Sequence, residues 1–222
     1  KPEYSAVDSV EIWDPKLGKV RPGGKLTTPR DRPALVELGN GKVLVIGGAS
    51  DKTKHASIEL YDPSTGASQV VASMSTARMA PMILPVADQG VLIAGGWVDD
   101  PVAGRAIEYL DFARNTCTVV GQAQVTRAEA AIVWLSRNEF ALVGGKDSFG
   151  GRDPHAYAFQ LTERFRVVLT EVGSISSRQG PPDPAQAGVR TQGADRRAAR
   201  YKRTCATQAG LERPKVFSLR AA

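Results

Sequence analysis

A double glycine returns three times along the chain at a nearly constant interval. Gly47-Gly48, Gly95-Gly96 and Gly144-Gly145 recur at steps of 48 and 49 residues. Each pair ends an apolar run of the kind found in buried strands, such as Val43-Leu44-Val45-Ile46. Self-similarity at a fixed period of this length is typical of repeat architectures, in which every repeat is one supersecondary unit. The chain is therefore predicted to be an array of similar units.

Three further residue types keep the same interval. They are a glutamate, an aspartate and an arginine, found at Glu11, Glu59 and Glu108, at Asp14, Asp62 and Asp111, and at Arg30, Arg78 and Arg127. Four residue patterns that recur at the same interval are not a coincidence. Catalytic groups usually break the symmetry of a repeat, so the recurring glutamate is interpreted as a structural or solvated strand position.

Each repeat contains the pattern of four short strands. In the repeat around Gly47-Gly48 we expect strands at 33–38, 42–46, 58–61 and 67–72, with a polar loop over 49–55. Gly39-Asn40-Gly41 predicts a two-residue hairpin, because Asn-Gly tolerates the positive φ angles that it needs. Asp62-Pro63-Ser64-Thr65-Gly66 predicts a second turn with Gly66 left-handed, and Asn115 stands at that position in the next repeat.

A period of about 50 residues with four antiparallel strands is typical of a β-propeller blade. The double glycines, the strands Val-Glu-Ile-Trp-Asp-Pro and Ile-Glu-Leu-Tyr-Asp-Pro, and Met74-Ser75-Thr76-Ala77-Arg78 carry a more specific likeness. In these residues the chain resembles the kelch-repeat family. The resemblance implies an all-β fold of four-stranded antiparallel kelch-type blades, with the double glycines as structural turns. About three blades fit into the chain, so we expect an incomplete ring and a fragment of a larger propeller.

The repeats are assigned to residues 7–48, 49–96 and 97–145, followed by a degenerate repeat over 146–178. Adding 49 residues to the third strand of the third repeat predicts a strand at 156–160, where neither the glutamate nor the aspartate is present. Residues 1–178 are therefore assigned to the propeller segment. Residues 179–222 are predicted to be a disordered, low-complexity tail, because their few large apolar side chains cannot offset the entropy of ordering them.

The net charge of +6 belongs to that tail. Residues 178–222 hold ten Lys and Arg against three acids, which leaves residues 1–177 with a net charge of −1. A basic, solvated segment accounts for this pattern, and binding to nucleic acid is therefore considered unlikely. No apolar run approaches the length of a membrane-spanning helix, so no membrane span is expected.

One arginine departs from the repeat. Arg30, Arg78 and Arg127 recur before the first strand of every blade and are most simply explained as structural, although binding by them is kept as a candidate role. Arg32 has Ala80 and Glu129 as its counterparts. Arg suits carboxylate recognition because its guanidinium donates two parallel hydrogen bonds. Kelch domains that bind acidic peptides use an Arg at this offset, so the resemblance implies a binding role for Arg32.

The loops between the second and third strands vary as the loops of a binding face do. Their candidate binding residues are Ser50, Asp51, His55, Trp97 and Asp99. A large aromatic side chain on a loop contacts a partner or packs between blades, and the sequence leaves both readings of Trp97 open.

These observations favour a non-enzymatic recognition module that binds a protein or carbohydrate ligand. The two histidines, His55 and His155, lie 100 residues apart, so no metal site, cofactor or catalytic residue is assigned. The alternative is part of a kelch-propeller enzyme, either galactose oxidase-like or otherwise carbohydrate-active, whose catalytic residues lie in other blades. Self-association of the open arc is a further possibility. The resemblance also suggests an exported bacterial protein.

Overall fold

The computed structural model of the chain describes residues 5–51, 53–146, 162–171 and 215–221. Almost all regular structure in these ranges is β-strand, and the one helical element is the 3-10 turn Ala103–Arg105. No helix among them has both the length and the apolar character of a membrane span. Strands β1 to β14, with most of β15 and β16, lie in one compact unit, Lys1–Leu169 with Phe217–Ala222.

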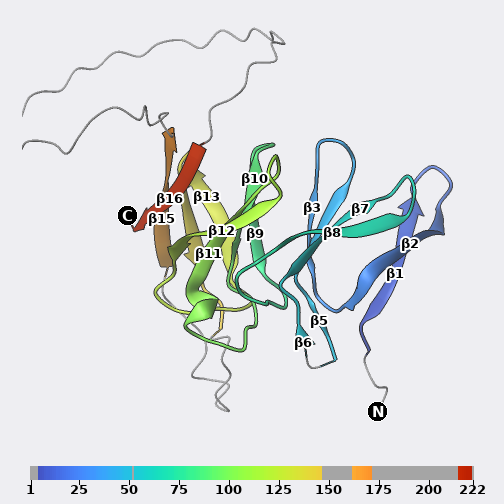
Figure 1. The fold of residues 1–222 in the computed structure, drawn as a ribbon, viewed down its shortest axis with the longest axis horizontal. Helices are drawn as coiled ribbons and strands as arrows, with labels where there is room; N and C mark the ends of the chain where they lie inside the picture. Colours follow the sequence, from blue (N-terminus) through green and yellow to red (C-terminus); the bar gives the residue numbers. More distant parts are fainter. Residues whose placement is uncertain (1–4, 52, 147–161, 172–214, 222) are drawn as a thin grey trace, which may run out of the picture. The chain divides into compact units, whose positions relative to one another are not determined.

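The described strands form three four-stranded sheets, which we call blades (Figure 1). Blade 1 contains β3 (Ala34–Glu37), β4 (Val43–Ile46), β7 (Ser57–Asp62) and β8 (Ala67–Ser73). Blade 2 contains β9 (Met82–Val86), β10 (Gly90–Ala94), β11 (Ala106–Asp111) and β12 (Thr116–Gln122). Blade 3 contains β13 (Ala131–Ser136), β14 (Glu139–Val143), β15 (Thr162–Glu171) and β16 (Lys215–Ala221). The strands of each blade are hydrogen-bonded in chain order, which is the order that the repeat predicts for blades 1 and 2.

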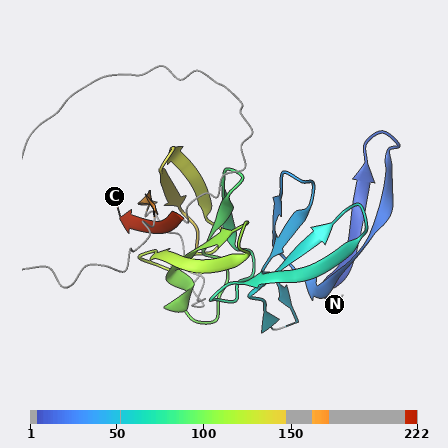
Figure 2. The same cartoon turned by 45° about the horizontal axis from the view of Figure 1, so that its top comes forward.

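Two smaller sheets complete the described structure. The N-terminal strands β1 (Val7–Asp14) and β2 (Lys19–Arg30) pair only with each other, and we call this pair the half-blade. It matches the third and fourth strands of a blade. A short hairpin, β5 (Ala49–Ser50) with β6 (Thr53–Lys54), forms where the sequence predicted a polar loop. Figure 2 shows the half-blade beside blade 1, on the side away from blade 2.

Blade 3 departs from the expected register. Its third strand is β15, which pairs antiparallel with β14 from Val143↔Thr162 to Glu139↔Arg166. The strand predicted at 156–160 lies outside the described residues. Lys215–Ala221, within the segment expected to be disordered, forms β16, the fourth strand of the blade. The expectation of disorder came from the small number of large apolar side chains in this segment. A strand can also form through backbone hydrogen bonds to a neighbouring strand, and these do not depend on apolar side chains.

The hairpin between β3 and β4 has three residues in its loop instead of two. The amide of Gly41 donates to the carbonyl of Leu38, and the amide of Leu38 donates to the carbonyl of Lys42. Gly41 has a φ of +78°, whereas Asn40 is not among the residues with positive φ. This is a turn followed by a left-handed glycine, the common alternative to the two-residue hairpin. The Asn40 side chain instead accepts a hydrogen bond from the Lys42 amide.

The second turn of the repeat has the predicted form. Gly66 is left-handed with a φ of +73°, and Asn115 takes the same conformation with a φ of +52°. The Asp62 carboxylate accepts hydrogen bonds from the hydroxyl and the amide of Ser64. These bonds, together with Lys42, lower the pKa of Asp62 from 3.8 to about 2.

The lowered pKa of Asp62 gives a test of this turn. The folded state holds the carboxylate ionised more strongly than the unfolded chain does, so its stabilising effect is complete above pH 3.8 and is lost as the pH falls toward 2. Carboxyl NMR is expected to show a titration midpoint near pH 2, and Asp62→Asn serves to assign the signal. A midpoint near the ordinary aspartate value would contradict the hydrogen-bonded turn.

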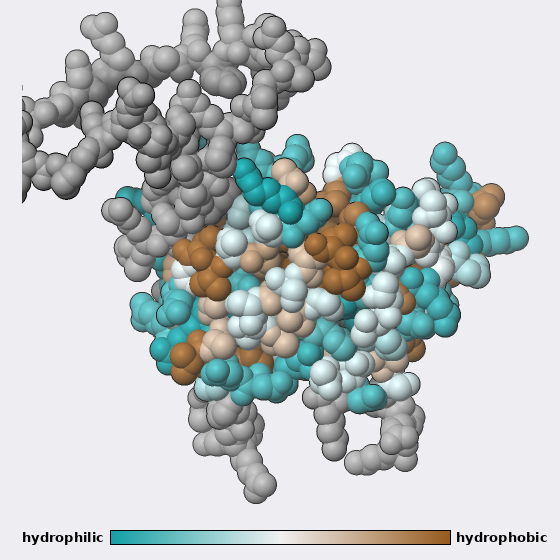
Figure 3. Space-filling view, viewed as in Figure 1, coloured by the Kyte–Doolittle hydropathy of each residue, from teal (hydrophilic) through white to brown (hydrophobic). Residues whose placement is uncertain are grey.

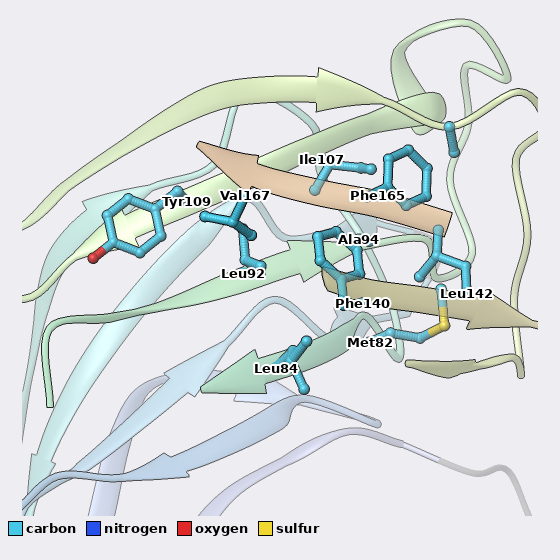
Figure 4. Close-up of a cluster of buried hydrophobic side chains, with 11 residues drawn as sticks. Met82, Leu84, Leu92, Ala94, Ile107, Tyr109, Phe140, Leu142, Phe165 and Val167 are labelled. Carbon is cyan, nitrogen blue, oxygen red and sulfur yellow. The ribbon is translucent and has the colours of Figure 1, made fainter. Parts of the chain in front are cut away.

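The hydrophobic core lies between consecutive blades. One cluster joins blade 2 to blade 3, with Phe140 stacked on Phe165 at a centroid distance of 5.1 Å (Figure 4). Leu92 and Ile107 lie in this cluster and are fully buried. A second cluster joins blade 1 to blade 2. Hydrophobic residues also reach the surface, where Figure 3 shows them in patches bordered by hydrophilic residues.

Candidate binding face

The repeated arginines are buried. Arg30, Arg78 and Arg127 are 5%, 0% and 1% exposed. Each forms an ion pair with a glutamate on the third strand of the blade that follows it in the chain, at 2.6 Å for Arg30–Glu59 and 3.2 Å for Arg78–Glu108. Arg127 pairs with Glu163 at 2.5 Å. Their burial removes these three residues from the candidate binding surface.

Each buried pair is held by further hydrogen bonds. Arg78 donates to the carbonyls of Gly95, Gly104 and Ala106, and Glu108 accepts from the amide of Ser75. Burial lowers the pKa of Arg78, against the opposing charge of Glu108. The pairs therefore fasten the connection between two blades to the third strand of the following blade.

The groups around Glu59 favour the ionised form of its carboxylate. Burial alone would raise the pKa of Glu59, but hydrogen bonds from Ser68, Thr27 and Arg30 outweigh that effect and lower it. A buried carboxylate with three such donors is satisfied as an anion. The repeated glutamate is thus structural, one of the two roles that the sequence allowed.

Glu163 is the member of this set that sequence reasoning missed. The arginine and its glutamate are 29 residues apart in blade 1, 30 in blade 2 and 36 in blade 3. A fixed step of 49 residues therefore placed the third strand of blade 3 too early. A search for any Glu on an alternating strand after Arg127 would have found Glu163.

The segment before the first strand and the segment after the second strand meet at one end of each blade. Isolated bridges join Asp31 to Ala49, Met79 to Trp97, and Ala128 to Lys146. In blade 1 the bridge has two backbone hydrogen bonds of 2.6 and 2.9 Å. This arrangement places Arg32 beside the β5–β6 hairpin, so the two sequence-predicted groups of blade 1 lie on one face.

Arg32 occupies a backbone position that every blade repeats. Its φ is +48°, and those of Ala80 and Glu129 are +50° and +55°. The Ala80 amide donates to the Arg32 carbonyl across the two blades at 2.8 Å. The Arg32 side chain is 60% exposed, and its contact with Asp31 is a surface ion pair of 3.6 Å. Because alanine takes the same position in blade 2, the fold needs the backbone of Arg32 and not its guanidinium.

The β5–β6 hairpin brings two more predicted residues together. The Ser50 hydroxyl and Nε2 of His55 are 3.0 Å apart. Burial lowers the pKa of His55, and the positive charge of Arg30 acts in the same direction. Asp51, at the tip of the hairpin, is exposed and has a φ of +51°.

Blade 2 contributes Trp97 and Asp99 to the same face. Asp99 forms an ion pair with Lys54 of the β5–β6 hairpin, which links the loops of blades 1 and 2. Trp97 is half-buried, and its indole nitrogen Nε1 is enclosed without a hydrogen-bond partner among the described residues. We call Arg32, Ser50, His55, Trp97 and Asp99 the loop face. Within the described ranges, no three His, Cys, Asp or Glu side chains gather as metal ligands do.

Comparison with known proteins agrees with these features. A model of the kelch motif matches residues 32–75, which cover β3 to β8. None of the curated proteins matches the chain. Among solved structures, that of YjhT is similar, with a TM-score of 0.54 and 12% sequence identity, over 67% of this chain and 53% of YjhT. At that identity the likeness concerns the fold, and this chain spans about half of the YjhT chain. Residues 32–75 therefore carry a kelch motif, and the described chain is built from kelch-type β-propeller blades.

Proposed function

We propose that this chain is a non-enzymatic recognition module that binds a carboxylate-bearing protein or carbohydrate through the loop face. The observation that supports the proposal is the exposed guanidinium of Arg32, on a backbone that alanine adopts equally well in the next blade. Residues repeated in every blade are explained by folding. Arg32 is exposed and has alanine as its counterpart in the next blade, so its guanidinium is free to contact a ligand, and loops held by a rigid scaffold are where binding residues concentrate.

The neighbours of Arg32 suit such a ligand. Trp97 offers an aromatic surface to the apolar parts of a peptide or sugar. Ser50 and His55 offer polar atoms on the adjoining hairpin. Arg32 supplies the positive charge and the paired donors that a carboxylate accepts. Together these residues give one charged, one aromatic and one polar contact on a single face.

The proposal is tested by binding to arrays of peptides and glycans that contain matched acidic and neutral members. Arg32→Ala is expected to weaken binding to the acidic members about thirtyfold, which corresponds to about 2 kcal/mol for a partly desolvated arginine. Trp97→Ala is expected to weaken binding to all members that bind. The melting temperature of Arg32→Ala should stay close to that of the wild-type protein, because Ala80 already occupies the equivalent position.

Arg114→Ala is the matched control, because Arg114 is also a surface arginine paired with an aspartate, at the turn after β11. It should leave binding unchanged. If Arg32→Ala binds the acidic members as well as wild type does, or lowers the melting temperature while leaving affinity intact, Arg32 is structural and the proposed function is wrong.

A further inference from the structure

The half-blade leaves an apolar groove against blade 1. The groove has a volume of about 530 Å³. Its lining includes Val7, Val10 and Ile12 of β1 and Leu35, Val43 and Val45 of blade 1. Val7 and Leu35 are 58% and 59% exposed. Among the described strands, β1 pairs with β2 alone, so its other edge presents unpaired backbone groups beside the groove.

The contact between blades 1 and 2 indicates what such a groove holds. There, the two inner strands β3 and β4 and the strand β7 pack in one cluster against blade 2. The members from blade 1 are Val36, Leu44, Ile46 and Ile58, and those from blade 2 are Val91, Ile93 and Leu110. All seven side chains are at most 5% exposed.

At the positions one repeat earlier in the chain, where the half-blade meets blade 1, only part of this cluster is present. The counterparts of Val91, Ile93 and Leu110 are Val43, Val45 and Tyr61, and all three line the groove. The counterpart of Ile58 is Val10, which also lines the groove. The described residues supply no counterparts of Val36, Leu44 and Ile46. The groove therefore lacks three aliphatic side chains that come from two adjacent inner strands.

Glu11 indicates a fourth missing group. Its counterparts Glu59 and Glu108 are fully buried and paired with arginines that precede the inner strands. Glu11 is exposed and forms no ion pair with any described residue. In the repeat, the arginine that pairs with this glutamate is part of the same segment as the two inner strands. A segment that fills the groove would therefore bring an arginine to Glu11.

We propose that the groove and the free edge of β1 bind a β-hairpin in which an arginine precedes two strands, with large aliphatic side chains facing the groove. Its second strand pairs antiparallel with β1, as β4 pairs with β7 in blade 1. The pairing satisfies the backbone groups along β1, and the alternate side chains fill the groove. The arginine forms a salt bridge with Glu11.

The repeat provides a probe, because residues 27–48 of this chain contain such an arginine and hairpin. A labelled synthetic peptide of that sequence is expected to bind the full chain. Glu11→Gln in the protein should weaken binding at least about tenfold, the usual effect of losing a charge-assisted hydrogen bond. A peptide in which Arg30 is replaced by alanine should bind wild type and Glu11→Gln with equal, weakened affinity. That equality would place the peptide arginine at Glu11.

Val10→Asp should abolish binding by placing a charge in the groove. Val70→Asp is its matched control, because Val70 is 54% exposed on the outer strand β8 and does not line the groove. Circular dichroism melts check that every variant is folded. Failure of the wild-type chain to bind the peptide, or equal affinity of wild type and Glu11→Gln for the arginine-containing peptide, would overturn the proposal. So would sedimentation showing a dimer that Val10→Asp dissociates, because a second copy would then be the occupant.

Discussion

Replacing Arg78 with alanine is expected to lower the free energy of unfolding by about 3–5 kcal/mol, the usual cost of breaking a buried ion pair from one side. The Glu108 carboxylate would remain in an interior where both partners are fully buried. The carbonyls of Gly95, Gly104 and Ala106 would also lose their donor. Equilibrium unfolding in urea measures the effect.

Two further variants isolate the cause of the Arg78 effect. Arg32→Ala removes an arginine from the surface of the adjoining blade and should change the free energy of unfolding by no more than about 0.5 kcal/mol. Arg78→Met combined with Glu108→Met removes both charges, so it should be less destabilising than Arg78→Ala, although the three carbonyls stay unpaired. A loss below about 1 kcal/mol for Arg78→Ala would show that the pair does not fasten the blades.

The second large effect is expected at the double glycines, for which the glycine in the turn between β1 and β2 offers a matched control. Gly47 has a φ of +65°, and a Cβ atom there would lie 2.5 Å from the carbonyl oxygen of Arg78, in the connection from blade 1 to blade 2. Gly18, in the turn between β1 and β2, has a similar φ of +60°, and the nearest described atom to its Cβ position is a Trp13 side-chain carbon at 4.0 Å, an ordinary contact. Gly47→Ala should cost about 2–5 kcal/mol, because conformational strain and a clash add together. Gly18→Ala should cost only the strain, about 1–2 kcal/mol.

The difference between these two alanine variants measures the contact between blades, because the backbone conformation is common to both. In blades 1 and 2 the second glycine of the pair donates its amide to the same carbonyl, from Gly48 to Arg78 and from Gly96 to Arg127. Urea unfolding of both variants under identical conditions gives the comparison. Equal losses at Gly47 and Gly18 would mean that the close approach of the Arg78 carbonyl contributes nothing.

These two predictions concern residues that recur from blade to blade and stabilise the fold. The residues of the loop face do not recur in this way. Arg32, Trp97 and the Ser50–His55 contact occur in single blades, so variants at these positions should separate binding from stability. Variants at Arg78 or Gly47 cannot do so, because a loss of binding would follow from a loss of folding.

The sequence predicted the strands and turns of blades 1 and 2 closely, because local signals agree there with the long-range repeat. The Asp62 to Gly66 turn is the clearest case, since its aspartate, proline and glycine each act within five residues. The hairpin at Gly39 to Gly41 was predicted less well. Asn-Gly is compatible with two loop lengths, and the pairing of Leu38 with Lys42 decided between them.

Blade 3 was predicted poorly for a physical reason. A constant step assumes that every loop has the same length, but the connection between β14 and β15 is longer than its equivalents in the other blades. Strand pairing depends on the edge that a strand meets and not on its distance along the chain. The sequence for this reason missed Glu163, and it did not place Lys215–Ala221 beside the strands of blade 3.

By itself, the sequence determined the class of the fold, the blade repeat and the position of Arg32 outside it, because these follow from periodicity and from turn chemistry. Only the tertiary structure decided that Arg30, Arg78 and Arg127 are buried partners of Glu59, Glu108 and Glu163. An arginine before a strand has the same local pattern whether it faces solvent or an anion. Which of these it meets depends on a glutamate about 30 residues away, brought within hydrogen-bonding distance by the packing of one blade on the next.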